Sequence, residues 1–176
     1  MTLQLHKYWR DIISPILHPE PPPTIPQAVV IRGREVLLIK RDNPALWELP
    51  GGGMLPHETP EQAIVREVRE ETGIQTRIVA LLGWYERTGL RPHLSPVYIT
   101  HPIGGQLRPQ LDEAIIVRYF TLPNLPYSLF PWYRPILLQD IRNPALKPLY
   151  RTQHLGLRTA LHCLYLDIGS RLAMFD

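Results

Sequence analysis

Apolar residues recur along the chain at two different spacings, which predict strands in some stretches and helices in others. Runs rich in β-branched residues lie at 27–32 and 35–40, and the Gly33-Arg34 pair between them predicts a hairpin. Further strand-like runs lie at 75–87, 96–103 and 114–121. Apolar residues follow a helical spacing at 60–72 and at 132–142. They also do so in the proline-free stretch 149–176, at Leu157, Leu161, Leu164 and Ile168. This order of elements predicts an α/β fold in which helices cover a mixed sheet.

Prolines are expected to mark the connections, because proline is excluded from helix interiors and central strands. The chain contains 20 prolines, and clusters of them lie before residue 27 and between 123 and 148. Residues 3–17 have loosely helical spacing, and 18–26 predict an extended strap. We therefore divide the chain into an N-terminal helix and proline-rich strap, 1–26, and a domain that includes a C-terminal helix, 27–176. The first helix is expected to pack on the domain, with an oligomer contact or a membrane-surface helix as alternatives.

Composition and charge narrow the class of protein. Hydrophobic residues make up 44% of the chain and charged residues 20%, as in ordinary globular domains. The net charge of +3 suits an anionic substrate but is too small to predict a stable nucleic-acid partner. The single cysteine, Cys163, excludes an intramolecular disulfide and fits a reducing, cytoplasmic location. No apolar run approaches the roughly 18 residues of a membrane-spanning helix, so no membrane partner is expected.

The helix predicted at 60–72 is specified at both ends. Thr59 is a good N-cap, Pro60 suits the first helical position, and Gln62 completes a capping box. Gly73 is placed to end the helix in a left-handed conformation.

Three carboxylates on this helix, Glu67, Glu70 and Glu71, fall within about a 100° arc. Like charges at this spacing repel one another, so the stripe needs a compensating cation. Arg66 and Arg69 flank the stripe without lying in it. Two interpretations are open: a solvated face paired with neighbouring arginines, or a site where carboxylate oxygens bind Mg²⁺ or Mn²⁺.

The wider pattern favours the metal site. From Gly52 the chain follows G-x5-E-x7-R-E-V-x-E-E-x-G-I, whose fixed residues are Gly52, Glu58, Arg66, Glu67, Glu70, Glu71 and Gly73. This pattern matches the Nudix box, and the chain resembles a Nudix hydrolase. The similarity extends from about residue 27 to 125 and includes the WELPGG run at 47–52 and the DEAIIVRYF run at 112–120.

The resemblance implies a fold and a reaction. The fold is an α/β/α sandwich around a mixed sheet, with the box as a loop–helix–loop. The reaction is Mg²⁺-dependent hydrolysis of a nucleoside diphosphate linked to another group, with Mn²⁺ as an alternative ion. A cation bridges the carboxylates and the anionic pyrophosphate, which would otherwise repel each other.

The resemblance also implies roles for single residues. Glu67, Glu70 and Glu71 resemble the family's metal ligands, and Arg66 its orienting arginine, held by Glu58 or Glu67. Gly51, Gly52 and Gly53 are expected to bring backbone groups close to the metal and the substrate. The general base is left open between Glu70 and Glu113, with Asp112 as the fallback.

The substrate is predicted less sharply than the reaction. ADP-ribose or another nucleotide sugar is favoured, and clean-up of nucleoside triphosphates is the alternative. A non-catalytic nucleotide-sensing domain is a third interpretation, and a homodimer is left open.

Other polar and aromatic residues are weighed as substrate contacts. Arg87, Arg91 and Arg108 are candidates for a distal phosphate, although a surface charge is favoured for each. Five aromatic residues are candidates for stacking on a nucleobase: Trp84, Tyr85, Tyr98, Trp132 and Tyr133. A position in the core is favoured for each of them. The seven histidines show no metal-ligand spacing, and His57 alone lies in the box loop.

Overall fold

The computed structural model describes residues 22–108, 114–142 and 147–172 of the chain. Within these ranges the strands are β1 (Gln27–Arg32), β2 (Glu35–Arg41), β3 (Trp47–Glu48), β4 (Ile74–Gly89), β5 (His93–Gly105), β6 (Ala114–Thr121) and β7 (Leu149–Leu155). The α-helices are α3 (Pro60–Thr72), α4 (Tyr133–Leu138) and α5 (Leu157–Arg171), with short 3₁₀ helices at Leu122–Asn124 and Asp140–Arg142. The helix predicted at 3–17 lies outside the described residues.

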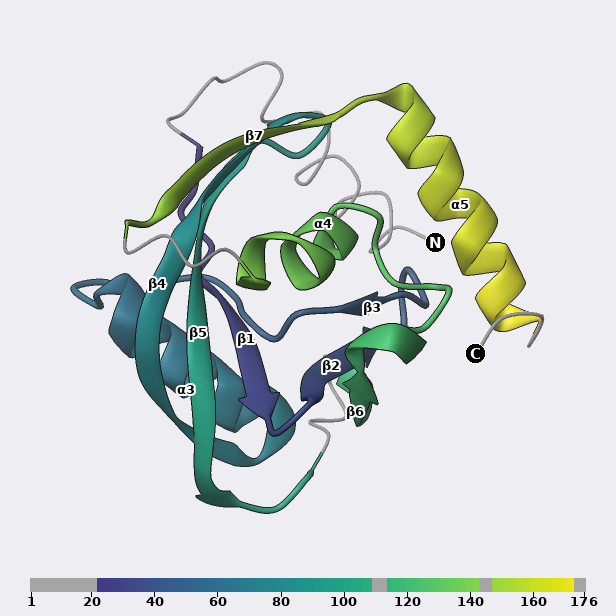
Figure 1. Cartoon of the computed structure of the whole chain (residues 1–176). Coiled ribbons are helices and arrows are strands. Elements are labelled where there is room, and N and C mark those ends of the chain that lie inside the picture. The colour runs from purple at the N-terminus through teal and green to yellow at the C-terminus, as the bar shows by residue number, and fades with distance from the viewer. Residues whose placement is uncertain (1–21, 109–113, 143–146, 173–176) are drawn as a thin grey trace.

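The strands form a mixed sheet, which confirms the sequence prediction (Figure 1). The strand order is β3-β2-β1-β5-β4-β7, and β6 pairs with β2. β1 runs parallel to β5 and β4 runs parallel to β7, whereas the other pairs are antiparallel. β1 pairs with β2 only at Ile31 and Arg32, so the sheet divides there into two parts.

Alternation along the strands buries residues on both faces of this sheet. Ala28 and Val30 of β1 share a buried cluster with Ile64 of α3. Val29, which lies between them, shares a different cluster with Ile136 of α4, and α5 also contributes to that cluster. The layers are therefore helix, sheet, helix, as predicted, with α3 on one face and α4 and α5 on the other. No helix in the described ranges is both long and apolar enough to cross a bilayer.

The described end of the proline strap extends the sheet beside β5. Thr24 forms a parallel bridge with Leu94, whose carbonyl accepts a 2.8 Å hydrogen bond from the Ile25 N–H. The Leu94 N–H donates in turn to the carbonyl of Pro23 at 3.0 Å. A proline lacks a donor but keeps its acceptor, so Pro23 can take part in this bridge.

The expectation that prolines avoid the sheet is wrong at two positions in β5. Pro96 and Pro102 both lie within this strand. They fall just outside Val97–Thr100, the stretch that pairs with β1. Both are nonetheless paired with β4, where Pro96 lies opposite Trp84 and Pro102 lies opposite Thr76.

The C-terminal part differs from the prediction in two ways. The sequence does not predict β7. It is an edge strand with mostly exposed side chains, so its sequence lacks the alternation of apolar and polar residues that indicates a strand. The closing helix is confirmed as α5, but its predicted apolar positions face solvent: Leu157 is 72% exposed and Leu161 is 57% exposed. The helix packs on the domain through Leu166 and Gly169 instead.

Candidate active site

Helix α3, which carries the carboxylates, begins and ends where the sequence predicts. The Thr59 side chain accepts from the Gln62 N–H at 3.3 Å, and the Gln62 side chain accepts from the Thr59 N–H at 2.9 Å. Gly73 ends the helix in the left-handed region, with φ of 74°, and its N–H donates to the Arg69 carbonyl. These caps satisfy backbone groups that a helix leaves unpaired at its ends, so the glutamates sit on a fixed frame.

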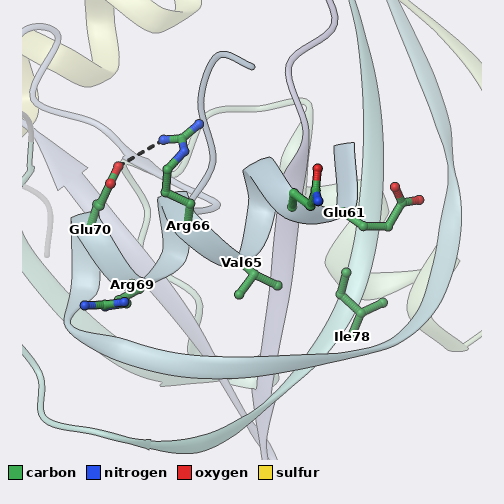
Figure 2. Close-up of a pocket in the computed structure, with 7 residues that line it drawn as sticks. Glu61, Val65, Arg66, Arg69, Glu70 and Ile78 are labelled. Atoms are coloured by element: carbon green, nitrogen blue, oxygen red, sulfur yellow. Dashed lines mark hydrogen bonds and ion pairs between the residues drawn. The ribbon is translucent and has the colours of Figure 1, made fainter. Parts of the chain in front are cut away.

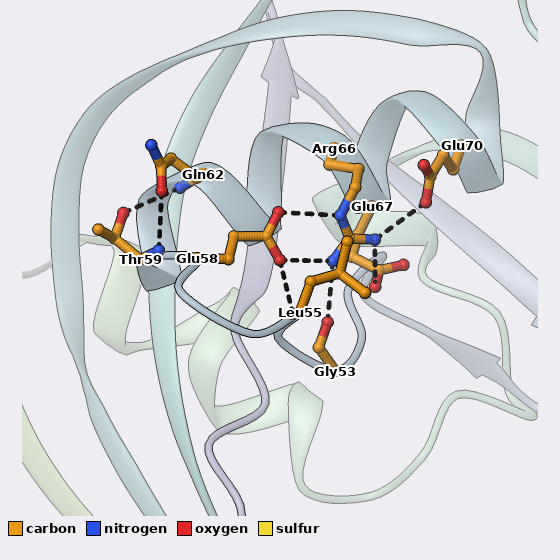
Figure 3. A network of polar contacts seen from close by, with 8 residues as sticks. All are labelled: Gly53, Leu55, Glu58, Thr59, Gln62, Arg66, Glu67 and Glu70. Atoms are coloured by element: carbon orange, nitrogen blue, oxygen red, sulfur yellow. Dashed lines mark hydrogen bonds and ion pairs between the residues drawn. The ribbon is translucent and has the colours of Figure 1, made fainter.

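Arg66 is the centre of a polar network on this helix (Figure 3). Its guanidinium forms a two-pronged contact with Glu58, from Nε to Oε1 at 2.9 Å and from Nη2 to Oε2 at 2.8 Å. Nη1 donates to Glu67 at 2.8 Å and to Glu70 at 2.9 Å, and Nη2 also donates to the carbonyl of Gly53. The arginine therefore ties the glycine loop to the helix and contacts two of the three carboxylates directly.

The glycine loop approaches the carboxylates closely at Gly51 and Gly52. The N–H of Gly51 donates to Oε2 of Glu71 at 2.8 Å. A Cβ on Gly52 would lie 2.6 Å from the carboxylate carbon of Glu67. Two of the three glutamates thus lie directly beside the backbone of the loop.

The carboxylates of Glu71 and Glu58 have opposite electrostatic environments. Burial, followed by repulsion from Glu48, raises the pKa of Glu71 well above its usual value, and the Gly51 N–H opposes this only in part. Hydrogen bonds from Arg66 and from the Leu55 N–H lower the pKa of Glu58. The buried acid that faces Gly51 is therefore the one that a cation would stabilise most.

An arginine compensates part of the negative charge of the carboxylate stripe. Arg66 does pair with Glu67 and Glu70, so an arginine takes part of the compensating role expected of a metal. Among the described residues, no three acidic, histidine or cysteine side chains are gathered closely enough to hold a metal ion. The donor set still fits a hard divalent cation, because it consists of carboxylate oxygens beside a glycine loop and includes the buried Glu71.

An open groove of about 720 Å³ lies along the outer face of α3 (Figure 2). It is lined by Glu61, Gln62, Val65, Arg66, Arg69 and Glu70 of the helix and by Ile78 of β4. The groove reaches Glu70 but neither Glu67 nor Glu71, so it flanks the carboxylate site.

The other candidate residues are buried, partly or fully exposed, or outside the described ranges, and Arg91 and Arg108 are exposed, as favoured. Glu113 and Asp112, the alternative bases, lie outside the described residues. Arg87, for which a surface charge was favoured, is only 1% exposed, which corrects that expectation. Tyr85 and Tyr133 are buried in the core, as favoured.

Sequence reasoning missed two polar residues beside the site. Glu48 on β3 forms an ion pair with Arg41 at 3.1 Å and repels Glu71. Gln27 of β1 forms a bridge with Gly51. Glu48 lies within the WELPGG run, so its position in that motif was an available signal. Nothing in the sequence marks Gln27.

Known proteins have sequences similar to that of this chain. Residues 23–139 match the NUDIX domain family. An ADP-ribose pyrophosphatase of Methanocaldococcus jannaschii is 38% identical over 108 residues, which are 58% of this chain and 63% of that protein. A putative 8-oxo-dGTP diphosphatase of Bacillus subtilis is 32% identical over 143 residues, which are 80% of this chain and 93% of that protein.

A solved structure supports the same assignment. The crystal structure of a MutT NUDIX hydrolase from Burkholderia pseudomallei is similar, with a TM-score of 0.63 and 31% sequence identity. The similar region covers 68% of this chain and 98% of that one. The capped carboxylate helix, the sheet that supports it and these relatives lead to one conclusion. The chain belongs to the Nudix hydrolase family, whose members act on phosphoric anhydride bonds.

Proposed function

We propose that the protein hydrolyses a nucleoside diphosphate linked to another group and uses Mg²⁺ to do so. The observation that carries this proposal is the buried carboxylate of Glu71, which contacts the Gly51 N–H and lies on the same helix as Glu67 and Glu70. Burial raises the pKa of this acid, so a bound cation would stabilise its charged form. Carboxylate oxygens favour Mg²⁺, or Mn²⁺ as the alternative, over softer metals.

In this proposal each residue of the box has its own task. Glu67, Glu70 and Glu71 hold the ion, and Arg66, fixed by Glu58, orients the carboxylates. When bound, the ion neutralises charge on the pyrophosphate and lowers the pKa of water. Gly51–Gly53 allow the substrate to approach the backbone closely.

The proton of the attacking water passes to a general base, for which we propose Glu70 or Glu113. The Glu70 side chain is 50% exposed and forms an ion pair with Arg66, so solvent reaches it. The water oxygen forms a bond to one phosphorus as the bridging P–O bond breaks. The products are a nucleoside monophosphate and the phosphorylated second group.

We favour ADP-ribose or another nucleotide sugar as the substrate. The 38% identity to an ADP-ribose pyrophosphatase supports this choice. The 32% identity to a putative 8-oxo-dGTP diphosphatase supports the alternative, a nucleoside triphosphate. The products separate the two, because a triphosphate cleaved to its monophosphate releases pyrophosphate and ADP-ribose does not.

A substrate panel with product identification tests the proposed function. ADP-ribose, other nucleotide sugars and nucleoside triphosphates are incubated with the protein in Mg²⁺ and, separately, in excess chelator. We expect release of AMP and ribose 5-phosphate from ADP-ribose in Mg²⁺ only. Nucleotide binding that needs no Mg²⁺, with no turnover on the whole panel, would instead support a nucleotide-sensing domain.

A further inference from the structure

Arg87 of β4 is a buried cation whose hydrogen bonds connect several elements. It is 1% exposed, and its guanidinium donates to Gln27 Oε1 of β1 at 2.9 Å and to Ser95 Oγ of β5 at 3.1 Å. It also contacts His93 Nε2 at 2.8 Å and Gln153 Oε1 of β7 at 3.2 Å. Each of these four acceptors is an uncharged side chain, which is unusual for a buried arginine.

Aromatic rings of the segment around α4 lie next to this guanidinium. Its central carbon is 5.1 Å from the ring centre of Tyr133 and 5.8 Å from that of Trp132. The Tyr133 hydroxyl also accepts a hydrogen bond from Gln27 Nε2. Arg87, Gln27 and Tyr133 therefore form a closed set of contacts that links α4, which lies against the sheet in Figure 1, to β1 and β4.

Gln27 connects this set to the glycine loop. It forms an antiparallel bridge with Gly51, and the neighbouring Ala28 N–H donates to the Pro50 carbonyl at 2.9 Å. A Cβ on Gly51 would lie 2.8 Å from Gln27 Cα and 3.1 Å from its side-chain Cγ. The glycine thus packs on both the backbone and the side chain of Gln27, so a shift of Gln27 would shift Gly51.

Gly51 in turn contacts Glu71, the buried carboxylate of the site. Its N–H donates to Glu71 Oε2 at 2.8 Å, and Glu71 is only 4% exposed. Groups that hold a metal ligand in place typically change metal affinity by tenfold or more when they are removed.

We infer that Arg87, Gln27 and Tyr133 are positioning residues that set the affinity for the divalent ion through Gly51 and Glu71. The inference rests on the proposed function only for the assignment of Glu71 as a metal ligand. None of the three needs to touch the substrate or the ion.

The experiment measures Mn²⁺ binding to the full chain by electron paramagnetic resonance, which needs no substrate and no turnover. Gln27→Leu keeps the Cγ packed on Gly51 but removes the amide, and Tyr133→Phe removes the hydroxyl that Gln27 contacts. We expect each to raise the Mn²⁺ dissociation constant about fivefold or more.

A matched control separates positioning from general destabilisation. Tyr85→Phe also removes one buried hydroxyl, from the same strand as Arg87, but that hydroxyl donates to Asp140 at 2.9 Å. We expect Tyr85→Phe to lower the melting temperature and to leave the Mn²⁺ dissociation constant within about twofold. If Tyr133→Phe and Gln27→Leu also leave it unchanged, or if Tyr85→Phe raises it equally, the inference is wrong.

A further variant keeps this result separate from the proposed function. Glu71→Gln is expected to weaken Mn²⁺ binding strongly, because it removes a proposed ligand. Normal binding by Glu71→Gln would overturn the metal assignment itself. Weak binding by Glu71→Gln with normal binding by both Gln27→Leu and Tyr133→Phe would overturn only the positioning network.

Discussion

The carboxylates of the site are stabilised in two different ways, by ion pairs with Arg66 and by a backbone hydrogen bond to Glu71. Arg66 contacts Glu58, Glu67 and Glu70, whereas Glu71 is buried against the Gly51 N–H. The Glu70 side chain is 50% exposed, and an exposed helical pair four residues apart contributes only about 0.3–0.5 kcal/mol. Its contact with Arg66 is therefore the easiest one to exchange for a cation.

A methyl group on Gly52 tests whether the carboxylates must lie against the loop. In Gly52→Ala the new Cβ would lie 2.6 Å from the Glu67 carboxylate, which can move because it ends a flexible side chain. We expect little change in melting temperature but a loss of Mg²⁺-dependent turnover of about tenfold or more.

The control for this change is Gly104→Ala in β5. A Cβ there would make an ordinary 3.4 Å contact with Gln75 and would not touch the site. Equal turnover by the Gly52→Ala variant and the wild type, measured as kcat in saturating Mg²⁺, would show that the contact between Glu67 and the loop is dispensable.

At the scale of elements, the sequence predicted best where local chemistry decides the structure. The limits of α3 follow from Thr59, Gln62 and Gly73, whose capping contacts depend on near neighbours alone. β7 could not be predicted in this way, because its strand character comes from pairing with β4, more than 60 residues earlier in the chain. The burial of Arg87 has the same origin, since its acceptors come from three other strands.

The capping box of α3 is expected to make a measurable contribution to the free energy of unfolding. Thr59→Ala removes the side-chain oxygen that accepts from the Gln62 N–H, and we expect a loss of about 1 kcal/mol in the free energy of unfolding. Thr159→Ala makes the same change in the first turn of α5, where Gly156 is the N-cap, and is expected to cost less. Urea denaturation of both variants gives the comparison, and equal losses would mean that the cap contributes nothing specific.

At the scale of the whole molecule, the half-buried His93 joins the sheet to the polar network. Because Arg87 can only donate, His93 Nε2 accepts from it, and Nδ1–H donates to the Arg91 carbonyl at 2.7 Å. Burial, followed by the charge of Arg87, lowers the pKa of His93 to about 4. Protonation of Nε2 would place a second donor against the guanidinium, so the folded state keeps this ring neutral.

This lowered pKa predicts how stability depends on pH. Between about pH 4 and 6.5 the unfolded chain binds a proton at His93 that the folded chain does not, so stability falls as the pH is lowered through this range. At pH 5 the loss is about 2 kcal/mol. His93→Gln should therefore lose less stability than the wild type between pH 7 and pH 5.

Denaturant unfolding at the two pH values measures the difference. His162→Gln on the exposed side of α5 is the control, and it should follow the wild type. Identical pH dependence in His93→Gln and the wild type would mean that His93 is not kept neutral by the fold.

The division of the chain at residue 26 and the homodimer stay predictions on this scale.

The central claim is that the carboxylates of α3 carry a metal-dependent hydrolysis, and one measurement tests it most directly. The turnover of the Glu70→Gln/Glu71→Gln double variant is compared with that of the wild type in Mg²⁺, on the best substrate of the panel. The amides keep the size of the side chains, so the variant should fold, with the wild-type circular dichroism spectrum. We predict that turnover falls by about three orders of magnitude or more. Full activity in the folded double variant would contradict the account.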